Sequence, residues 1–500
     1  MFSVPVTINP FFQIINMSRI LFSHSYLMRL DPKQWATGQP YPPLATITAA
    51  AVCRNAGHEV FLHDSFFDDG ASRIIPSFVK VQPEIFVLYD DGFNYLTKMC
   101  LTNMREAAFQ MIAHARKHGC RVIVSSSDST DHFDQFLNAG ADVVLLGEAE
   151  QTLLELLGAI ENNTSFTSIK GMAFRQDGNT IRTPARPVLN NLDTLPLPAW
   201  DLVNIEPYRK MWMQSTGYFS LNVATTRGCP FKCNWCAKPI YGNRYNVRSP
   251  EHVVMELKLM KARFNFDHIW FCDDIFGLKP GWISSFARLV KEAGLVFTFR
   301  IQARADLLLQ GNTIAALAAA GCENVWMGAE SGSQKILDAM DKGITVEQIR
   351  DATKLLKEAG IKPSFFLQFG YPGESREDIR ATIRMVNTLL PHSIGISVSY
   401  PLPGTVFYEK VKEQLKEKTN WTDSDEMQLM FRNTYQPAFY KQLHVYTHKT
   451  FRKQVAFDTL KHCIRRPASM NFRSLKKAAS MLYYLPASII AKQKLEYLSK

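Results

Sequence analysis

The sequence lacks any uninterrupted apolar run long enough to cross a bilayer, and no basic segment precedes the apolar residues of its start, Met1–Asn16. We therefore expect neither a membrane-spanning nor an exported protein. Cysteine is also scarce, with 9 in 500 residues, and three of these lie between positions 229 and 236. This clustering is typical of metal ligation in a reducing compartment and not of a disulfide framework. A cytoplasmic location is expected.

Charge of one sign is almost missing from the end of the chain. Between residues 431 and 500 there are 14 Lys and Arg against 2 Asp and Glu, whereas the whole chain has a net charge of only +11. Such a basic segment fits an anionic partner such as lipid, nucleic acid or an acidic substrate, but it equally fits a solvated helical surface. The overall composition, with 46% hydrophobic and 21% charged residues, is that of a globular protein.

Five segments can be distinguished along the chain. Residues 1–18 form an N-terminal extension with little pattern. Residues 19–160 alternate short apolar runs with amphipathic stretches, which predicts a doubly wound, Rossmann-like α/β domain. Residues 161–217 lose this periodicity and contain Pro184, Pro187, Pro196 and Pro198, so we expect a linker.

Residues 218–420 contain six further strand-like runs, and each of the first five precedes a helical stretch. This repeat predicts a partial (βα)6 barrel, whose catalytic groups are expected at the carboxyl ends of the strands. Ser249 with Pro250, and Thr345 with Gln348, carry the signals that begin two of its helices. Residues 421–500 are expected to form a basic helical extension.

Cys229, Cys233 and Cys236 follow the first barrel strand directly. Three thiolates can hold three irons of a [4Fe-4S] cubane and leave the fourth iron open to a ligand. A structural zinc site needs four ligands, and neither a fourth cysteine nor a histidine is nearby in the sequence. A catalytic zinc held by three cysteines and three incidental core cysteines remain as alternatives.

The CxxxCxxC spacing, with Trp235 before the last cysteine, resembles the radical S-adenosylmethionine (SAM) superfamily. Motifs that follow the later strands are also similar to that superfamily: Phe271–Asp274, Arg304, Gly328–Ser331, Phe369–Glu374 and Pro401–Thr405. The resemblance implies that SAM binds the open iron of a [4Fe-4S] cluster. It also implies that an electron from a donor such as flavodoxin or ferredoxin cleaves SAM to a 5′-deoxyadenosyl radical.

The resemblance also suggests which residues bind the nucleoside. Glu330 would accept hydrogen bonds from the amino or ribose groups of SAM, and Arg304 would pair with its carboxylate. Gly328 and Gly370 would allow the backbone to approach, and Trp235 adjoins the cluster. As alternatives, Arg304 and Asp306 form a surface pair, and the glycines only make turns. Asp273 and Asp274 either position the substrate or cap a helix, and no catalytic residue is assigned.

The first domain resembles the cobalamin-binding domain that precedes the barrel in many radical SAM enzymes. Tyr41–Leu44, Asn55–Val60 and Gly147–Glu150 carry this likeness. There is no DxHxxG motif, and Ser125–Ser129 stands where relatives have paired glycines and a histidine. A domain that kept the fold but lost the cofactor is therefore the alternative to cobalamin binding. His24, His63 and His132 lack a motif that would make them axial ligands, so we expect ordinary structural roles.

The resemblance implies methyl transfer from cobalamin to an unactivated carbon. A radical cyclisation or rearrangement and a cluster- or corrinoid-based sensor are the alternatives. The substrate class stays open among lipids, tetrapyrroles and peptide natural products, and nucleic acid is not expected because no RNA-binding module is visible. Residues 421–466 resemble an extension of the anaerobic magnesium-protoporphyrin ester cyclases. Beyond them, 481–490 and its flanking lysines (Lys476, Lys477, Lys492 and Lys494) could dock on a membrane surface.

Overall fold

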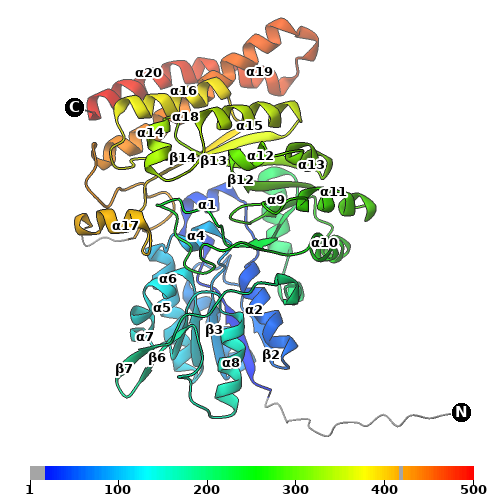
Figure 1. Cartoon of the computed structure of the whole chain (residues 1–500), viewed down its shortest axis with the longest axis vertical. Coiled ribbons are helices and arrows are strands. Elements are labelled where there is room, and N and C mark those ends of the chain that lie inside the picture. The colour runs from blue at the N-terminus through cyan, green and yellow to red at the C-terminus, as the bar shows by residue number, and fades with distance from the viewer. Residues whose placement is uncertain (1–16, 416–419, 500) are drawn as a thin grey trace, which may run out of the picture.

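The computed structural model describes residues 17–415 and 420–499, so most of the predicted extension 1–18 lies outside the described residues. Two large sheets and a group of C-terminal helices are stacked along the long axis of the molecule (Figure 1). The first sheet lies at the bottom of this view, the second above it, and the C-terminal helices at the top. The predicted Rossmann-like domain, partial barrel and helical extension are therefore present in sequence order.

The first sheet has the strand order β2-β1-β3-β4-β5-β6-β7. Its first five strands are parallel, as the Rossmann-like prediction requires. They span Arg19–Ser23 (β1), Glu59–Leu62 (β2), Ile85–Tyr89 (β3), Arg121–Ser125 (β4) and Val143–Leu145 (β5). Their near-continuous apolar runs are explained by burial on both faces of the sheet. The helices α2 (Leu44–Asn55), α5 (Thr102–Lys117) and α8 (Glu150–Glu161) pack against it.

Part of the predicted linker belongs to this sheet, which corrects the prediction for residues 161–217. β6 (Met172–Gln176) pairs antiparallel with β5, and β7 (Asn179–Arg182) pairs antiparallel with β6. Asp177 and Gly178 join them with φ of 50° and 78°. An Asp-Gly pair with positive φ at both residues is the usual signal for a two-residue hairpin, so the sequence contains a local signal for β6 and β7 despite the prolines around it. The helix α9 (Glu206–Thr216) then leads to the second sheet.

The second sheet is a six-stranded, all-parallel partial barrel, as predicted. Its order β15-β14-β13-β12-β11-β8 follows the chain without interruption. The strands are Ser220–Val223 (β8), His268–Phe271 (β11), Thr298–Ala303 (β12), Cys322–Glu330 (β13), Lys362–Phe369 (β14) and Ser393–Val398 (β15). The main helices between them are α10 (Pro250–Phe264), α11 (Trp282–Glu292), α13 (Thr313–Ala319), α15 (Val346–Glu358) and α16 (Arg376–Leu389).

Two barrel helices begin where their sequence signals placed them. Ser249 Oγ accepts a hydrogen bond from the backbone N–H of His252 at 3.1 Å, with Pro250 as the first residue of α10. Thr345 and Gln348 form the predicted capping box of α15, in which each side chain accepts from the backbone N–H of the other residue. These caps satisfy backbone donors that helix geometry leaves without a partner.

The C-terminal extension is helical only from Pro437 onward. Three helices complete it, α18 (Pro437–Arg465), α19 (Phe472–Ala479) and α20 (Met481–Leu498), with α18 packed against both α16 and α20. Before them, the described residues from Asn420 to Gln436 form no helix. Among the described residues, we find no helix with the length and apolar character needed to span a membrane.

Candidate functional site

The three clustered cysteines lie on the loop that follows β8 and the short strand β9 (Thr226–Arg227). Gly228 starts this loop with φ +76°, and a Cβ there would lie 2.4 Å from the carbonyl oxygen of Arg244. A side chain at this position would therefore force the loop away from the neighbouring backbone. Cys229, Cys233 and Cys236 are partly exposed, whereas the six other cysteines are buried. Of the nine cysteines, only these three are both close together in the sequence and accessible.

Burial raises the pKa of the Cys229 thiol, and it raises the pKa of Cys236 to about 12. Iron binds the thiolate form, so cluster binding would have to supply the positive charge that keeps these groups ionised. Within residues 17–415 and 420–499, no three His, Cys, Asp or Glu side chains are close enough together to hold a single metal ion. A cubane differs from a single ion because each of its thiolates binds a different iron. Three thiols on one partly exposed loop are therefore a donor set that fits a [4Fe-4S] cluster.

Asn234 fixes the cysteine loop to the rest of the barrel mouth. Its side-chain amide donates to Ala339 O and to Asp341 Oδ2, both at 2.8 Å, and its backbone N–H donates to Met340 O at 3.1 Å. The Tyr371 hydroxyl donates to the Asn234 carbonyl oxygen at 2.9 Å. Because Asn234 lies between Cys233 and Cys236, these bonds hold two of the three thiols in place. No motif in the sequence predicts this role.

Glu330 ends β13 and forms a buried ion pair with Lys342 at 2.7 Å. Burial lowers the pKa of Lys342, but the charges of Glu330 and Cys233 more than offset this effect, so the net shift is upward. Glu330 has φ +54° at a register irregularity between β13 and β14. Positive φ is uncommon outside glycine and concentrates at functional sites. Lys342 carries no motif, so sequence reasoning missed it.

Arg304 lies beside the cysteine loop. Its guanidinium is 3.7 Å from the centre of the Phe231 ring, and Nη1 is 3.9 Å from Cys233 Sγ. It also donates to both carboxylate oxygens of Asp306, at 3.0 and 3.2 Å, and to Gly343 O at 3.2 Å. The Arg304–Asp306 pair foreseen as an alternative exists, but Arg304 is only 6% exposed, so it is not a surface pair.

The remaining predicted site residues divide into two groups. At Gly328, a Cβ would lie 2.6 Å from Lys342 Nζ and 2.8 Å from Glu330 Oε1, so the glycine makes room for the ion pair. Lys342 Nζ lies 6.0 Å from the centre of the Trp235 ring, and the buried Nε1–H of Trp235 has no hydrogen-bond partner. Gly370 instead packs against Leu429 and Tyr440, with 3.2 Å from a Cβ to each. The structure thus gathers Glu330, Arg304, Gly328 and Trp235 near the cysteine loop, and places Gly370 against the C-terminal segment.

Side chains of the first domain reach the barrel mouth. Arg227, two residues before Cys229, donates to Glu148 at 2.5 Å and to Glu150 at 2.6 Å, and all three are buried. Lys98, in the short helix α4 (Tyr95–Lys98), pairs with Asp274 after β11 at 2.6 Å. The carboxyl ends of the first sheet therefore face the cysteine loop. The interpretation of Asp274 as a substrate or capping residue did not anticipate this pair.

Asp273 connects β11 to the base of the cysteine loop. Its carboxylate accepts hydrogen bonds from the backbone N–H groups of Thr225 and Thr226, at 2.7 and 2.8 Å, and from the Thr225 hydroxyl. Burial raises the pKa of Asp273 to about 7. The residue thus positions the strand end that carries the thiols.

The serine-rich segment of the first domain forms the short helix α6 (Ser127–Asp131), which begins two residues after β4. Ser126 and Ser129 make a capping box, and Asp128 forms an ion pair with Arg105. Ser127 Oγ is buried without a hydrogen-bond partner. A buried hydroxyl without a partner costs free energy, so it is a candidate contact for a polar ligand.

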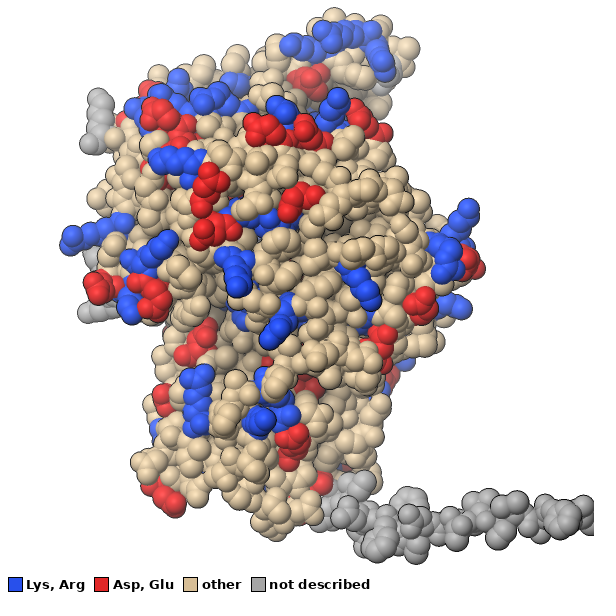
Figure 2. All heavy atoms as spheres, viewed as in Figure 1, with Lys and Arg blue, Asp and Glu red and all other residues tan. Residues whose placement is uncertain are grey.

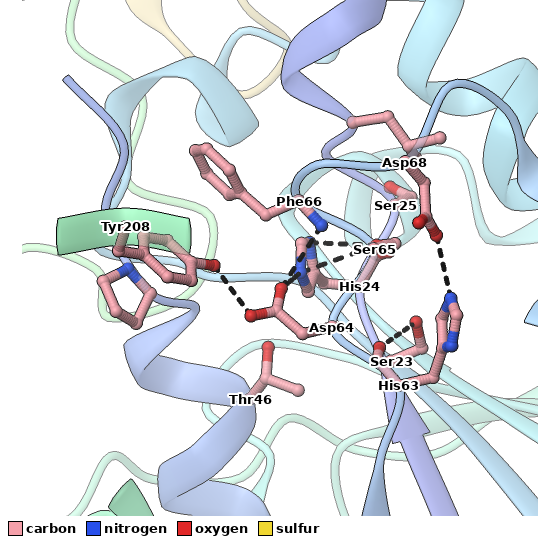
Figure 3. A network of polar contacts seen from close by, with 12 residues as sticks. Ser23, His24, Ser25, Thr46, His63, Asp64, Ser65, Phe66, Asp68 and Tyr208 are labelled. Carbon is pink, nitrogen blue, oxygen red and sulfur yellow. Dashed lines mark hydrogen bonds and ion pairs between the residues drawn. The ribbon is translucent and has the colours of Figure 1, made fainter. Parts of the chain in front are cut away.

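The histidines considered as axial ligands are engaged with carboxylates. His24 contacts Asp64 at 3.0 Å, and Asp64 also accepts a hydrogen bond from the Tyr208 hydroxyl at 2.8 Å (Figure 3). His63 contacts Asp68 and Ser77, both at 2.9 Å, and His132 lies 3.9 Å from Asp128. Because Tyr208 comes from α9, the His24–Asp64 contact helps to hold that helix on the first domain.

The fold and the site together define a class: a Rossmann-like domain joined to a partial barrel with a cysteine loop at its mouth. The model of the radical SAM superfamily matches residues 223–386. The chain is a radical SAM protein, related to the cobalamin-dependent radical SAM methyltransferases and to the anaerobic magnesium-protoporphyrin cyclases. This superfamily implies a [4Fe-4S] cluster and SAM.

Individual relatives agree with this assignment. An uncharacterized methyltransferase of Pyrococcus horikoshii is 30% identical over 282 residues, 56% of this chain and 60% of that protein. The anaerobic magnesium-protoporphyrin IX monomethyl ester cyclase of Rubrivivax gelatinosus is 25% identical over 280 residues, 55% of this chain and 50% of that protein. The matches therefore span between half and three fifths of these two relatives.

A solved structure extends the likeness to nearly the whole chain. The cobalamin-dependent SAM radical enzyme OxsB with aqua-cobalamin bound has a TM-score of 0.71 and 18% identity, covering 95% of this chain and 72% of that chain. At this identity the likeness concerns the fold. It confirms the arrangement of a Rossmann-like domain, a partial barrel and C-terminal helices.

Proposed function

We propose that this chain is a cobalamin-dependent radical SAM methyltransferase that acts on an unactivated carbon of a small molecule. The observation that carries the proposal is the contact between the segments that follow the strands of the two sheets. Arg227 joins Glu148 and Glu150 of the first domain to the cysteine loop, and Lys98 joins that domain to Asp274. A cofactor held at the carboxyl ends of the first sheet would therefore adjoin the site of radical formation.

The residues at the barrel mouth fit the cluster and its ligand. Cys229, Cys233 and Cys236 would hold the cluster through their thiolates. Arg304, already 3.9 Å from Cys233 Sγ, would pair with the SAM carboxylate. Glu330 would accept hydrogen bonds from the amino or ribose groups, while Lys342 pairs with it in a buried position. The unpartnered Trp235 Nε1–H offers a further donor.

The fit for cobalamin rests on the loops after the first-sheet strands. Ser127 Oγ is a buried hydroxyl without a partner, and Gly147, with φ +75°, brings the loop after β5 into contact with the backbone at Ile240, whose carbonyl oxygen is 3.5 Å from the position of a Cβ. These two positions would contact the cofactor. His24, His63 and His132 are engaged with carboxylates, so the proposal assigns the corrin no histidine ligand from this domain.

When bound, the cluster with SAM supplies a 5′-deoxyadenosyl radical that removes a hydrogen atom from the substrate, and cobalamin supplies the methyl group. One turnover consumes two SAM molecules: one yields 5′-deoxyadenosine and methionine, and the other yields S-adenosylhomocysteine. The chain's own part is to bind and orient these groups and to exclude water from them. A donor such as flavodoxin or ferredoxin would provide two electrons per turnover, one for the cleavage of SAM and one to return cobalamin to the state that the second SAM can methylate, in a cytoplasmic setting.

A radical cyclisation or rearrangement without methyl transfer is the second candidate. The observation that favours it is the serine segment after β4, where Ser126 bonds to Ser129 and Asp128 to Arg105, so that these polar groups are already paired within the chain. A lipid, a tetrapyrrole or a peptide natural product would suit either reaction. A redox or corrinoid sensor would keep the same cofactors without turnover.

The products formed from SAM distinguish these candidates without a known substrate class. The full chain, purified anaerobically and reconstituted with iron, sulfide and cobalamin, is incubated with SAM and a strong reductant. We expect both 5′-deoxyadenosine and S-adenosylhomocysteine, with the second product dependent on cobalamin. Deoxyadenosine alone, with or without cobalamin, would contradict methyl transfer and favour the cyclisation. If neither product forms, the result would favour the sensor.

A further inference from the structure

Helix α20 exposes an apolar face that nothing in the described chain covers. One side of the helix packs on α18, with Ala487, Ser488, Ala491 and Leu495 buried and Ala491 O accepting from Gln442 Nε2 at 2.9 Å. The opposite side carries Leu482, Leu485, Ile489 and Ile490, of which Leu482 is 82% exposed. Spacings of three and four residues place these side chains along one stripe. The helix is therefore apolar on both its packed and its outer face.

The exposed apolar side chains on this outer face form a continuous stripe and are not scattered singly. Single apolar side chains on a surface are normal, but a continuous stripe marks an interaction site. An aliphatic side chain left in water loses the stabilisation that burial would give it. Phe472 and Leu475 of α19 and Ile464 near the end of α18 are exposed on the neighbouring helices. The apolar exposure is thus concentrated in the last helices.

Basic side chains flank the stripe. Between residues 459 and 499 the sequence has eight Lys and Arg and one acidic residue, Glu496. At 100° per residue, Lys492 and Lys494 lie on the two sides of the α20 stripe, and Arg473, Lys476 and Lys477 are exposed on α19. Figure 2 shows Lys and Arg gathered over the end of the molecule formed by these helices, opposite the first sheet in Figure 1.

We propose that this surface, formed by the outer faces of α19 and α20, docks the enzyme on a membrane rich in anionic lipid. An apolar stripe bordered by lysines is the pattern of helices that lie in the membrane interface, with the aliphatic side chains among the acyl chains and the ammonium groups near the phosphates. A second copy of this chain would present the same positive charge and be repelled. The charge thus selects an anionic lipid surface over self-association. This membrane contact does not depend on which reaction the chain catalyses.

Vesicle sedimentation tests the docking with the full anaerobically purified chain. Vesicles of phosphatidylcholine with one quarter phosphatidylglycerol are compared with vesicles of phosphatidylcholine alone. We expect binding to the anionic vesicles, and at least about tenfold weaker binding to the neutral ones, because several lysines are attracted to an anionic surface. Absence of binding to the anionic vesicles overturns the proposal.

Two sets of variants separate the apolar and the charged contributions. Replacing Leu482, Leu485, Ile489 and Ile490 by Ser should lower vesicle binding at least about tenfold. The matched control replaces four apolar residues of similar exposure elsewhere, Val79, Leu259, Val296 and Leu355, by Ser and should bind normally. Replacing Lys476, Lys477, Lys492 and Lys494 by Gln should weaken binding to anionic vesicles only, whereas Lys117, Lys258, Lys291 and Lys354 changed to Gln should have no effect.

The charge variants keep the apolar packing of α20, so they test the docking even if the serine variant unfolds. Light scattering identifies the other occupant. A mass of two chains that falls to one in the serine variant, without vesicle binding, would overturn the membrane proposal and assign the face to a second copy of the chain. Equal binding by the two lysine sets would likewise contradict it.

Discussion

The carboxyl ends of the two sheets carry similar kinds of residues but use them differently. At the barrel mouth, Arg304, Trp235 and the Glu330–Lys342 pair surround the cysteine loop. At the first sheet, the polar side chains mainly bond to one another, as in the Ser126–Ser129 capping box. The barrel mouth therefore offers a separate side chain for each contact that we propose with the cluster and SAM. The first domain offers fewer free polar groups for the cobalamin that we propose there.

The largest expected effect concerns the cluster. Replacing Cys229, Cys233 and Cys236 together by Ala should reduce the iron content from about four per chain to almost none, because all three ligands are lost. Cys53, Cys120 and Cys322 are buried elsewhere, and their Ala variants should retain the iron. Iron and sulfide analysis after anaerobic reconstitution measures the effect. Four irons in the triple variant would place the cluster elsewhere.

The next effect concerns the link between the two regions. Arg227→Met leaves Glu148 and Glu150 buried without a cation, so the free energy of unfolding should fall by about 3–5 kcal/mol. Changing both glutamates to Gln in the same chain should recover much of this loss. The exposed Arg54–Asp201 pair provides the control, since Arg54→Met should cost about 1 kcal/mol or less. Denaturant unfolding measures all these variants, and equal effects of Arg227→Met and Arg54→Met would refute the link.

A smaller effect should depend on pH. Burial raises the pKa of Glu374, after β14, to about 8 from an ordinary value of 4.5. The folded chain therefore binds this proton more tightly than the unfolded chain, and stability falls as pH rises from about 4.5 to 8. Glu374→Gln should remove about 2–4 kcal/mol of that fall, whereas exposed Glu377→Gln should not. Thermal unfolding at several pH values tests this, and an unchanged pH dependence would contradict the buried, protonated carboxyl.

The smallest effect concerns the first domain. If Ser127 Oγ contacts the corrinoid, Ser127→Ala should weaken cobalamin binding by about 0.5–1.5 kcal/mol, or roughly two- to tenfold. Exposed Ser165→Ala should bind normally. Equilibrium binding followed by visible absorption gives both affinities. Unchanged cobalamin affinity in the Ser127 variant would show that this hydroxyl does not contact the cofactor.

The extent of sequence prediction differs between the two regions for physical reasons. Strand periodicity and helix caps are local, so both sheets and the capped starts of α10 and α15 were predictable. The hairpin β6–β7 was missed although Asp177-Gly178 signals it. Lys342 and Asn234 could not be found, because their roles depend on contacts between distant segments. The prediction for Gly370 did not foresee that Leu429 and Tyr440 pack against it.

The most direct test of the account is the cleavage of SAM by the anaerobically reconstituted chain. With a strong reductant, the account predicts 5′-deoxyadenosine that forms repeatedly and disappears when Cys229, Cys233 and Cys236 are replaced by Ala. A chain that contains about four irons but forms no 5′-deoxyadenosine would contradict the assignment of the cysteine loop as a site of radical formation.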